Sequence, residues 1–146
     1  MKNYILEKLT NYQELTSDEI MNLCDDKFLN SSFKLNLIKD KSKNAKVSDT
    51  KFYLKSSNNV LKFQYDEISG RLTICTSNDI TKDFESFVKK LTLDNCKIEF
   101  SCNSDFDVLL NILKNNNYVI EVVRKDRFYN GNYQDEVIIS KLKGGN

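Results

Sequence analysis

The sequence predicts a mixed α/β fold in which one sheet is flanked by helices. A strand–helix–strand unit runs from Arg71 to Cys102, and such a unit places its two strands in parallel through a right-handed crossover. Hairpin-like segments precede and follow the unit, and hairpins pair their strands antiparallel. Together these patterns predict a mixed sheet of about six or seven strands covered by about four helices.

Length and composition limit the classes of protein to consider. At 146 residues, the chain is expected to form a single domain over 1–143 with a flexible tail over 144–146. A net charge of +1 is too small to attract the protein electrostatically to nucleic acid. No apolar run approaches the roughly 20 residues that span a bilayer, and acidic residues come too early for a secretory signal. We expect a cytoplasmic monomer or homodimer without nucleic-acid or membrane partners.

The N-terminal segment predicts a strand and then a helix. Tyr4–Leu9 is interpreted as the first strand. Thr16 is followed three residues later by Glu19, the pattern of a capping box at a helix start. The apolar residues that follow at helical spacing are Ile20, Leu23, Cys24 and Phe28. We therefore predict a helix over 17–29.

The segment over 30–50 leaves two structures open, a second short helix or a packed loop. Its apolar residues are Phe33, Leu35, Leu37 and Ile38. Lys39–Lys46 is rich in lysine and is interpreted as an exposed linker. The alternative is a mobile flap beside a substrate site.

Three strands are predicted next, over 51–57, 60–68 and 71–76. The second alternates apolar and polar residues, as a half-buried antiparallel strand does. Its apolar residues are Leu61, Phe63 and Tyr65, and its polar residues are Lys62, Gln64 and Asp66. Ser69–Gly70 supplies a turn, and the following strand is apolar enough to lie at the centre of a sheet.

The period then changes to that of a helix. Its core-facing residues are Ile80, Phe84, Phe87, Val88 and Leu91. Cys96–Cys102 alternates again and predicts a strand. Ser104 and Asp107 resemble a capping box before another helix, whose apolar residues are Phe106, Leu109, Leu110 and Leu113. An Asn130–Gly131 turn joins two final strands.

The chain has four cysteines and no histidine. Cys75, Cys96 and Cys102 lie in apolar strand patterns and are interpreted as small buried hydrophobic residues. The alternative, a nucleophilic cysteine, would need lysine or a carboxylate as its base. Without histidine there is no Ser-His-Asp or Cys-His hydrolase site of the usual kind, and no metal site is predicted.

The last third of the chain, from Asn103 to Leu142, resembles the C-terminal end of the GNAT acyltransferases. That pattern is a helix, a Gly-Phe pair, a strand ending in basic residues, an Asn-Gly or Asp-Gly turn, and an aspartate opening the last strand. Asn117-Tyr118 stands at the Gly-Phe position, and Asp135 opens the last strand. The basic residues are Arg124, Lys125 and Arg127. The predicted element order also agrees with a GNAT-like acyl-CoA N-acyltransferase fold.

The resemblance implies acetyl-CoA as the cofactor and an amine or a protein N-terminus as the acceptor. In the family the cofactor lies where two parallel strands separate, with its pyrophosphate at the next helix N-terminus. The residues implied by position are Ile74, Thr76, Ser77, Asn78, Thr81 and Lys82. The loop over 77–82 departs from the family because it lacks glycine and contains Asp79. Leu113 stands where many members carry a tyrosine that protonates the leaving thiolate.

Several residues have both a functional and a structural interpretation. Glu99 and Glu121 are candidate general bases acting through water, or polar residues on a solvent-facing side. The candidates for lining the cleft, or alternatively for packing, are Tyr65, Tyr129 and Tyr133. The basic residues named above either hold an acidic ligand or form a charged hairpin face. The sequence thus favours a divergent GNAT-like N-acetyltransferase, and the alternative is a catalytically inactive GNAT-fold binding or interaction protein.

Overall fold

The computed structural model describes residues 1–24, 30–44, 46–93, 95–129 and 132–141. The helices are α1 (Lys2–Lys8), α2 (Ser17–Met21), α3 (Ser31–Ser42), α4 (Lys82–Lys90) and α5 (Asp107–Asn115). The strands are β1 (Gln13–Glu14), β2 (Lys51–Lys55), β3 (Val60–Asp66), β4 (Arg71–Thr76), β5 (Lys97–Asn103), β6 (Val119–Tyr129) and β7 (Asn132–Lys141). None of the described helices is long and apolar enough to cross a membrane.

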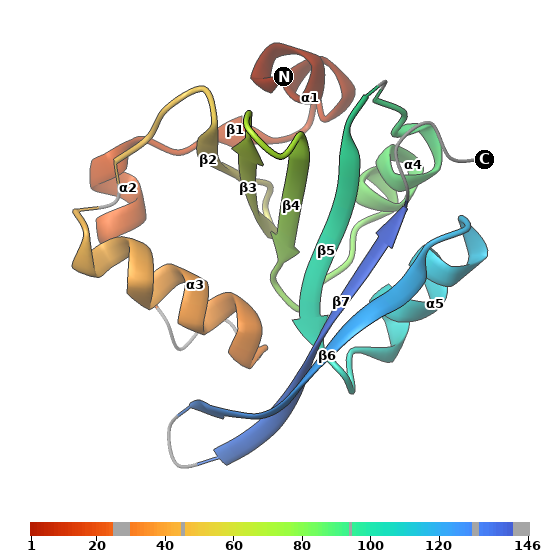
Figure 1. Ribbon diagram of the computed structural model, residues 1–146. Helices are drawn as coiled ribbons and strands as arrows, with labels where there is room; N and C mark the ends of the chain where they lie inside the picture. Colours follow the sequence, from red (N-terminus) through yellow and green to blue (C-terminus); the bar gives the residue numbers. More distant parts are fainter. Residues whose placement is uncertain (25–29, 45, 94, 130–131, 142–146) are drawn as a thin grey trace.

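All seven strands form one sheet in the order β1-β2-β3-β4-β5-β7-β6 (Figure 1). β4 and β5 are parallel, and every other neighbouring pair is antiparallel. The predicted mixed sheet and its central parallel unit are therefore confirmed. The described residues contain five helices, one more than the approximate number predicted.

Helices cover both faces of the sheet, and each face has its own core. The larger core joins α1, α4 and α5 to the sheet and includes Phe63, Phe84 and Phe100, none of which is exposed. The smaller core lies under α2 and α3, where Phe33 packs edge-on against Tyr53 at 6.2 Å between ring centroids. The sheet therefore separates an α4–α5 side from an α3 side.

The strand predicted over Tyr4–Leu9 is wrong, because these residues belong mostly to helix α1. Ile5 and Leu9 are buried one helical turn apart and pack into the larger core. The short run YILEKL fits a helix or a strand, and packing against the sheet selects the helix. The first strand follows it, as the short β1.

The two predicted capping boxes have different outcomes. At α2, Thr16 accepts a hydrogen bond from the Glu19 backbone and Glu19 accepts one from the Thr16 backbone, so this box is confirmed. The helix itself ends at Met21 rather than Leu29, and 25–29 lie outside the described residues. At α5 the second box is wrong, because the helix starts after Phe106 with no side-chain cap. The Asn130–Gly131 turn also lies outside the described residues.

The C-terminal end of α3 is fixed to the sheet by Asp40. Its carboxylate is 2% exposed and accepts hydrogen bonds from Tyr53 at 2.7 Å, Lys51 at 2.6 Å and Lys62 at 2.9 Å. Burial raises the pKa of Asp40, but these hydrogen bonds outweigh burial and hold it below its usual value. The predicted exposed linker over 39–46 is therefore wrong over 39–42, which belong to α3 and include the buried Asp40, and Lys62 is buried rather than facing solvent.

Replacing Asp40 by Asn should destabilise the protein by about 3 kcal/mol at pH 7, because Lys62 would stay buried without a negative partner. The folded pKa of Asp40 lies below its unfolded value, so its contribution is complete above the unfolded pKa, about 4. The contribution is lost as the pH falls through the folded pKa. Urea unfolding of both proteins between pH 7 and pH 2.5 should show the difference shrinking. Asp49→Asn, at a residue 97% exposed, is the matched control and should leave the midpoint unchanged. An Asp40→Asn protein as stable as the wild type at pH 7 would contradict this account.

Candidate functional site

The parallel strands β4 and β5 separate partway along their length. Their register runs from Arg71 opposite Lys97 to Ile74 opposite Phe100 and then ends. β4 nevertheless continues to Thr76 and β5 to Asn103. Beyond the last pair, the facing backbone groups need partners other than a neighbouring strand.

The first turn of α3 supplies partners at this separation. Asn30 caps α3 through the Phe33 backbone N–H, and its amide nitrogen donates to the Thr76 carbonyl on β4 at 2.7 Å. The Ser32 backbone N–H donates to the Asn103 side chain on β5 at 3.0 Å. The Ser32 hydroxyl donates to Glu136 on β7 at 2.9 Å. Asn30 and Ser32 are almost fully buried, and the first turn of α3 thus connects β4, β5 and β7 beyond the last β4–β5 pair.

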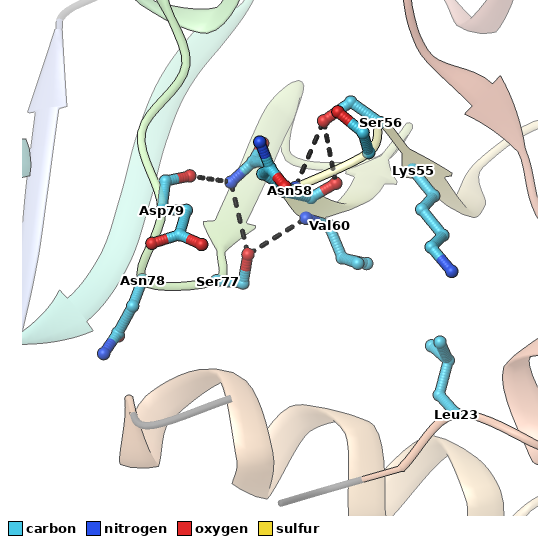
Figure 2. A pocket seen from close by; sticks show the side chains of 10 residues that line it. Leu23, Lys55, Ser56, Asn58, Val60, Ser77, Asn78 and Asp79 are labelled. Carbon is cyan, nitrogen blue, oxygen red and sulfur yellow. Dashed lines mark hydrogen bonds between the residues drawn. The ribbon is translucent and has the colours of Figure 1, made fainter. Parts of the chain in front are cut away.

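The loop between β4 and α4 is held by hydrogen bonds within the chain. The Thr81 side chain caps α4 by accepting from the Phe84 backbone N–H at 3.1 Å. The Asn59 amide donates to the Ser77 hydroxyl at 3.2 Å and also to the Asp79 carbonyl. Its carbonyl oxygen accepts from Tyr12, whose hydroxyl also lies 2.8 Å from the Thr81 hydroxyl. Figure 2 shows Ser77 directed at Val60, whose backbone N–H donates a hydrogen bond to the Ser77 hydroxyl at 2.9 Å.

Most of the residues predicted to bind the cofactor are buried or form structural hydrogen bonds instead. Ile74, Thr76 and Ser77 are buried, and the Thr81 hydroxyl is committed to the helix cap. Asn78 remains half-buried beside a cavity of about 320 Å³, and Lys82 is exposed.

The first turn of α4 also carries its own negative charge, from Asp83 and Glu85. Acidic side chains at a helix N-terminus already interact with its positive dipole end. The capped, acidic start of α4 is therefore a weaker anion site than a glycine-rich loop would be.

A larger cavity, of about 590 Å³, lies on the α3 side of the sheet. Helix α3 contributes Leu35, Asn36, Ile38 and Lys39 to its lining, and the sheet contributes Gln64, Thr73, Cys75, Glu99, Ser101, Arg124, Glu136 and Ile138. Cys75 and Ser101 come directly after the last β4–β5 pair. The cavity therefore adjoins the separation of the two strands.

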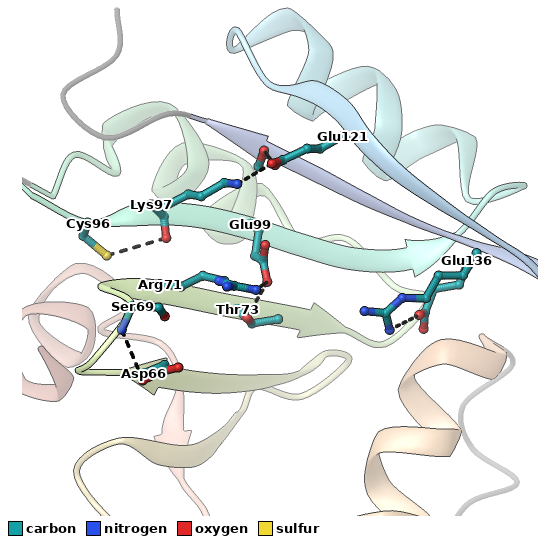
Figure 3. Close-up of polar contacts among 11 residues, drawn as sticks. Asp66, Ser69, Arg71, Thr73, Cys96, Lys97, Glu99, Glu121 and Glu136 are labelled. Atoms are coloured by element: carbon teal, nitrogen blue, oxygen red, sulfur yellow. Dashed lines mark hydrogen bonds and ion pairs between the residues drawn. The ribbon is translucent and has the colours of Figure 1, made fainter.

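Glu99, one of the two predicted bases, lines this cavity. It is 5% exposed, and the Thr73 hydroxyl donates to its Oε1 at 2.8 Å (Figure 3). Arg71 lies 3.8 Å from the same oxygen. Among the described residues none donates to Oε2. One oxygen of a buried carboxylate is thus left for a ligand or a water.

Glu121, the other predicted base, does not line the cavity. It forms an ion pair with Lys97 (Figure 3) and accepts a hydrogen bond from Ser140. The hydrogen bond from Lys97, followed by that from Ser140, lowers the pKa of Glu121. A carboxylate stabilised in its charged form is a weaker proton acceptor.

Among the described residues, the candidate tyrosines and cysteines do not add a catalytic group to the site. Tyr118 is buried against Phe100, and Leu113 is fully buried without a hydroxyl to offer. Tyr65 packs partly buried against the larger core, Tyr133 is exposed, and the Tyr129 side chain lies outside the described residues. Burial raises the pKa of Cys75 and Cys102 to about 12. The prediction that Cys75, Cys96 and Cys102 are buried is confirmed.

The predicted basic stretch is divided between two surroundings. Arg124 lines the cavity and lies 3.2 Å from Glu136. Lys125 does not line it and pairs with Asp135 at 3.3 Å on the exposed hairpin. The Arg127 side chain lies outside the described residues. Within the part of the chain that is described, no cluster of side chains is suited to a metal ion.

Replacing Asn30 by Ala should destabilise the protein by about 1–3 kcal/mol, because it removes both the α3 cap and the bond to Thr76. Hydrogen exchange should become faster in the first turn of α3. Ser31→Ala is the matched control, since the Ser31 side chain forms no hydrogen bond to any described residue. Equal exchange rates in both variants would show that Asn30 does not hold this turn in place.

Comparison with known proteins identifies the architecture. No protein-family model matches the sequence, and neither does any curated protein. Among solved structures, a variant of Vibrio cholerae spermidine N-acetyltransferase has a TM-score of 0.59 at 12% identity, over 90% of this chain and 94% of that chain. The Vibrio cholerae enzyme in complex with CoA and spermine has a TM-score of 0.54 at 14% identity, over 92% and 97%. A GNAT-family acetyltransferase from Streptococcus pneumoniae has a TM-score of 0.52 at 12% identity, over 91% and 98%. The chain therefore has the GNAT acyl-CoA N-acyltransferase fold.

Proposed function

We propose that the protein transfers an acetyl group from acetyl-CoA to an amine bound in the α3 cavity. The observation that supports the proposal best is the open oxygen of the buried Glu99 carboxylate in that cavity. A carboxylate in this position binds an ammonium group and, directly or through water, accepts the proton that leaves as the amine becomes a nucleophile.

The separation of β4 and β5 gives the two substrates a place to meet. The strands part after Ile74 and Phe100, next to the cavity. An acyl group entering between the strands from the α4 side would face an amine on the α3 side, and holding both reactants there supplies proximity. A backbone N–H of β4 would polarise the thioester carbonyl. The cofactor residues in this proposal are Asn78 and Lys82, together with the backbone around Thr76.

A second candidate function is ligand binding without catalysis, on the same fold. It is favoured by Asn30 and Ser32, which form hydrogen bonds to β4 and β5 at the strand separation, and by Thr81, which caps α4. In that case the α3 cavity binds its ligand and no acyl group is transferred. Affinity for CoA distinguishes the two functions.

Calorimetric titration with CoA and acetyl-CoA at low salt should show micromolar binding if the protein is a transferase. Lys82→Glu should weaken this binding at least tenfold, because it reverses the charge beside the phosphates. Its effect on helix stability should be only about 0.5 kcal/mol. Lys89→Glu, in the last turn of α4, is the control and should bind CoA as the wild type does. The absence of binding at millimolar CoA would exclude the transferase and leave the second candidate.

Glu99→Gln should lower the rate of amine acetylation by about 100-fold or more, because the proton acceptor is lost. CoA affinity should stay unchanged. Glu121→Gln, a matched change outside the cavity, should keep the rate within about twofold of the wild type. The assay follows thiol release from acetyl-CoA with a panel of primary amines. If Glu121→Gln were the slower enzyme, the roles assigned to the two carboxylates would be wrong.

A further inference from the structure

We infer that the α3 cavity takes an extended amphoteric molecule, whose ammonium group contacts Glu99 and whose anionic group contacts Arg124. The inference rests on the proposed binding of an amine at Glu99. It adds the chemical class of the acceptor, which the fold leaves open.

Charges of both signs line the cavity. The Glu136 carboxylate is engaged on both sides, by Ser32 at Oε2 and by Arg124 at Oε1. Glu99 is then the carboxylate of the cavity that has an oxygen available to a ligand, because Thr73 donates only to its Oε1.

The cations of the cavity are placed to contact an anion. The Arg124 side chain is 50% exposed and contacts Glu136 through Nη1. A guanidinium group has five N–H donors, so further donors remain for a ligand. Lys39 adds an exposed ammonium group from α3, with no partner among the described residues. A ligand with only positive charge would meet both cations without compensation, which disfavours simple amines and polyamines.

The sheet register sets the separation between the two contacts. Glu99 lies opposite Ser140 on β7, and Arg124 lies opposite Glu136 on the same strand. These β7 positions are four residues apart, which corresponds to about 13 Å along the strand, and Glu99 and Arg124 lie on either side of β7, about 10 Å apart across the sheet. Their long side chains shorten this gap without closing it. The ammonium and the anion of the ligand must therefore be several bonds apart, unlike those of an α-amino acid.

The wall of the cavity suits a hydrocarbon chain between the charged groups. Leu35 and Ile38 contribute apolar surface from α3, and Ile138 contributes it from β7. Apolar contact along the middle of a ligand with polar ends is the usual composition of a small-molecule site. An ω-amino acid with a chain of several methylene groups has this form.

Titration calorimetry without CoA tests the inference, with 6-aminohexanoate, hexylamine, hexanoate and glycine as probes. 6-Aminohexanoate should bind at least tenfold more tightly than each of the other three. Arg124→Gln should reduce its affinity to that of hexylamine, whereas Arg124→Lys, which keeps the charge, should retain part of the difference. Lys125→Gln is the matched control on the same strand and should change nothing. Glu99→Gln should weaken both 6-aminohexanoate and hexylamine.

The outcomes separate this inference from the proposed function. Equal affinity for hexylamine and 6-aminohexanoate would overturn the inference but would not contradict the proposed amine site. Glycine binding as tightly as 6-aminohexanoate would overturn the required spacing. If no probe bound at millimolar concentration, the inference and the amine site would both fail. Tight binding of 6-aminohexanoate without any acetyl transfer would support the inference and contradict only the transferase.

Discussion

The separation of β4 from β5 is the constraint on which the rest of the structure depends. Beyond Ile74 and Phe100 the two strands cannot satisfy each other's backbone groups, and buried polar groups without partners are costly. Asn30 meets this requirement at the Thr76 carbonyl, which fixes where α3 begins. Asp40 fixes where α3 ends against β2 and β3. The α3 cavity is the space left over the sheet by a helix held at both ends.

The contacts that stabilise the separation also occupy it, and their strength decides whether they exclude a cofactor. Three hydrogen bonds connect Asn30 and Ser32 to β4, β5 and β7. At about 1 kcal/mol each, more for the bond to a carboxylate, they total roughly 3–5 kcal/mol. Micromolar binding releases about 8 kcal/mol. A cofactor that displaces the first turn of α3 must therefore gain about 11–13 kcal/mol from its own contacts to bind at micromolar concentration.

Sequence periodicity was enough to predict the elements whose apolar residues lie on one face, such as the helix that contains Phe84 and Phe87. It failed for α1, where a short apolar run fits either period. The burial of Asp40 and Lys62 could not be predicted, because charged residues are exposed by default and these partners come from separate elements. Glu99 and Glu121 were equivalent in the sequence. The structure distinguishes them, because Lys97 and Ser140 contact Glu121 whereas Glu99 lines the cavity.

The two sides of the sheet are built differently, and this asymmetry bears on function more than the fold does, since one fold hosts many activities. On the α3 side a buried carboxylate keeps an oxygen open to a cavity that also contains cations. On the α4 side the helix start is capped by Thr81 and carries Asp83 and Glu85. The ligand binding that we propose for the α3 cavity uses none of the α4 groups. The amine recognition that we propose therefore does not itself require acyl transfer, which depends in addition on CoA binding at the α4 loop and at the strand separation.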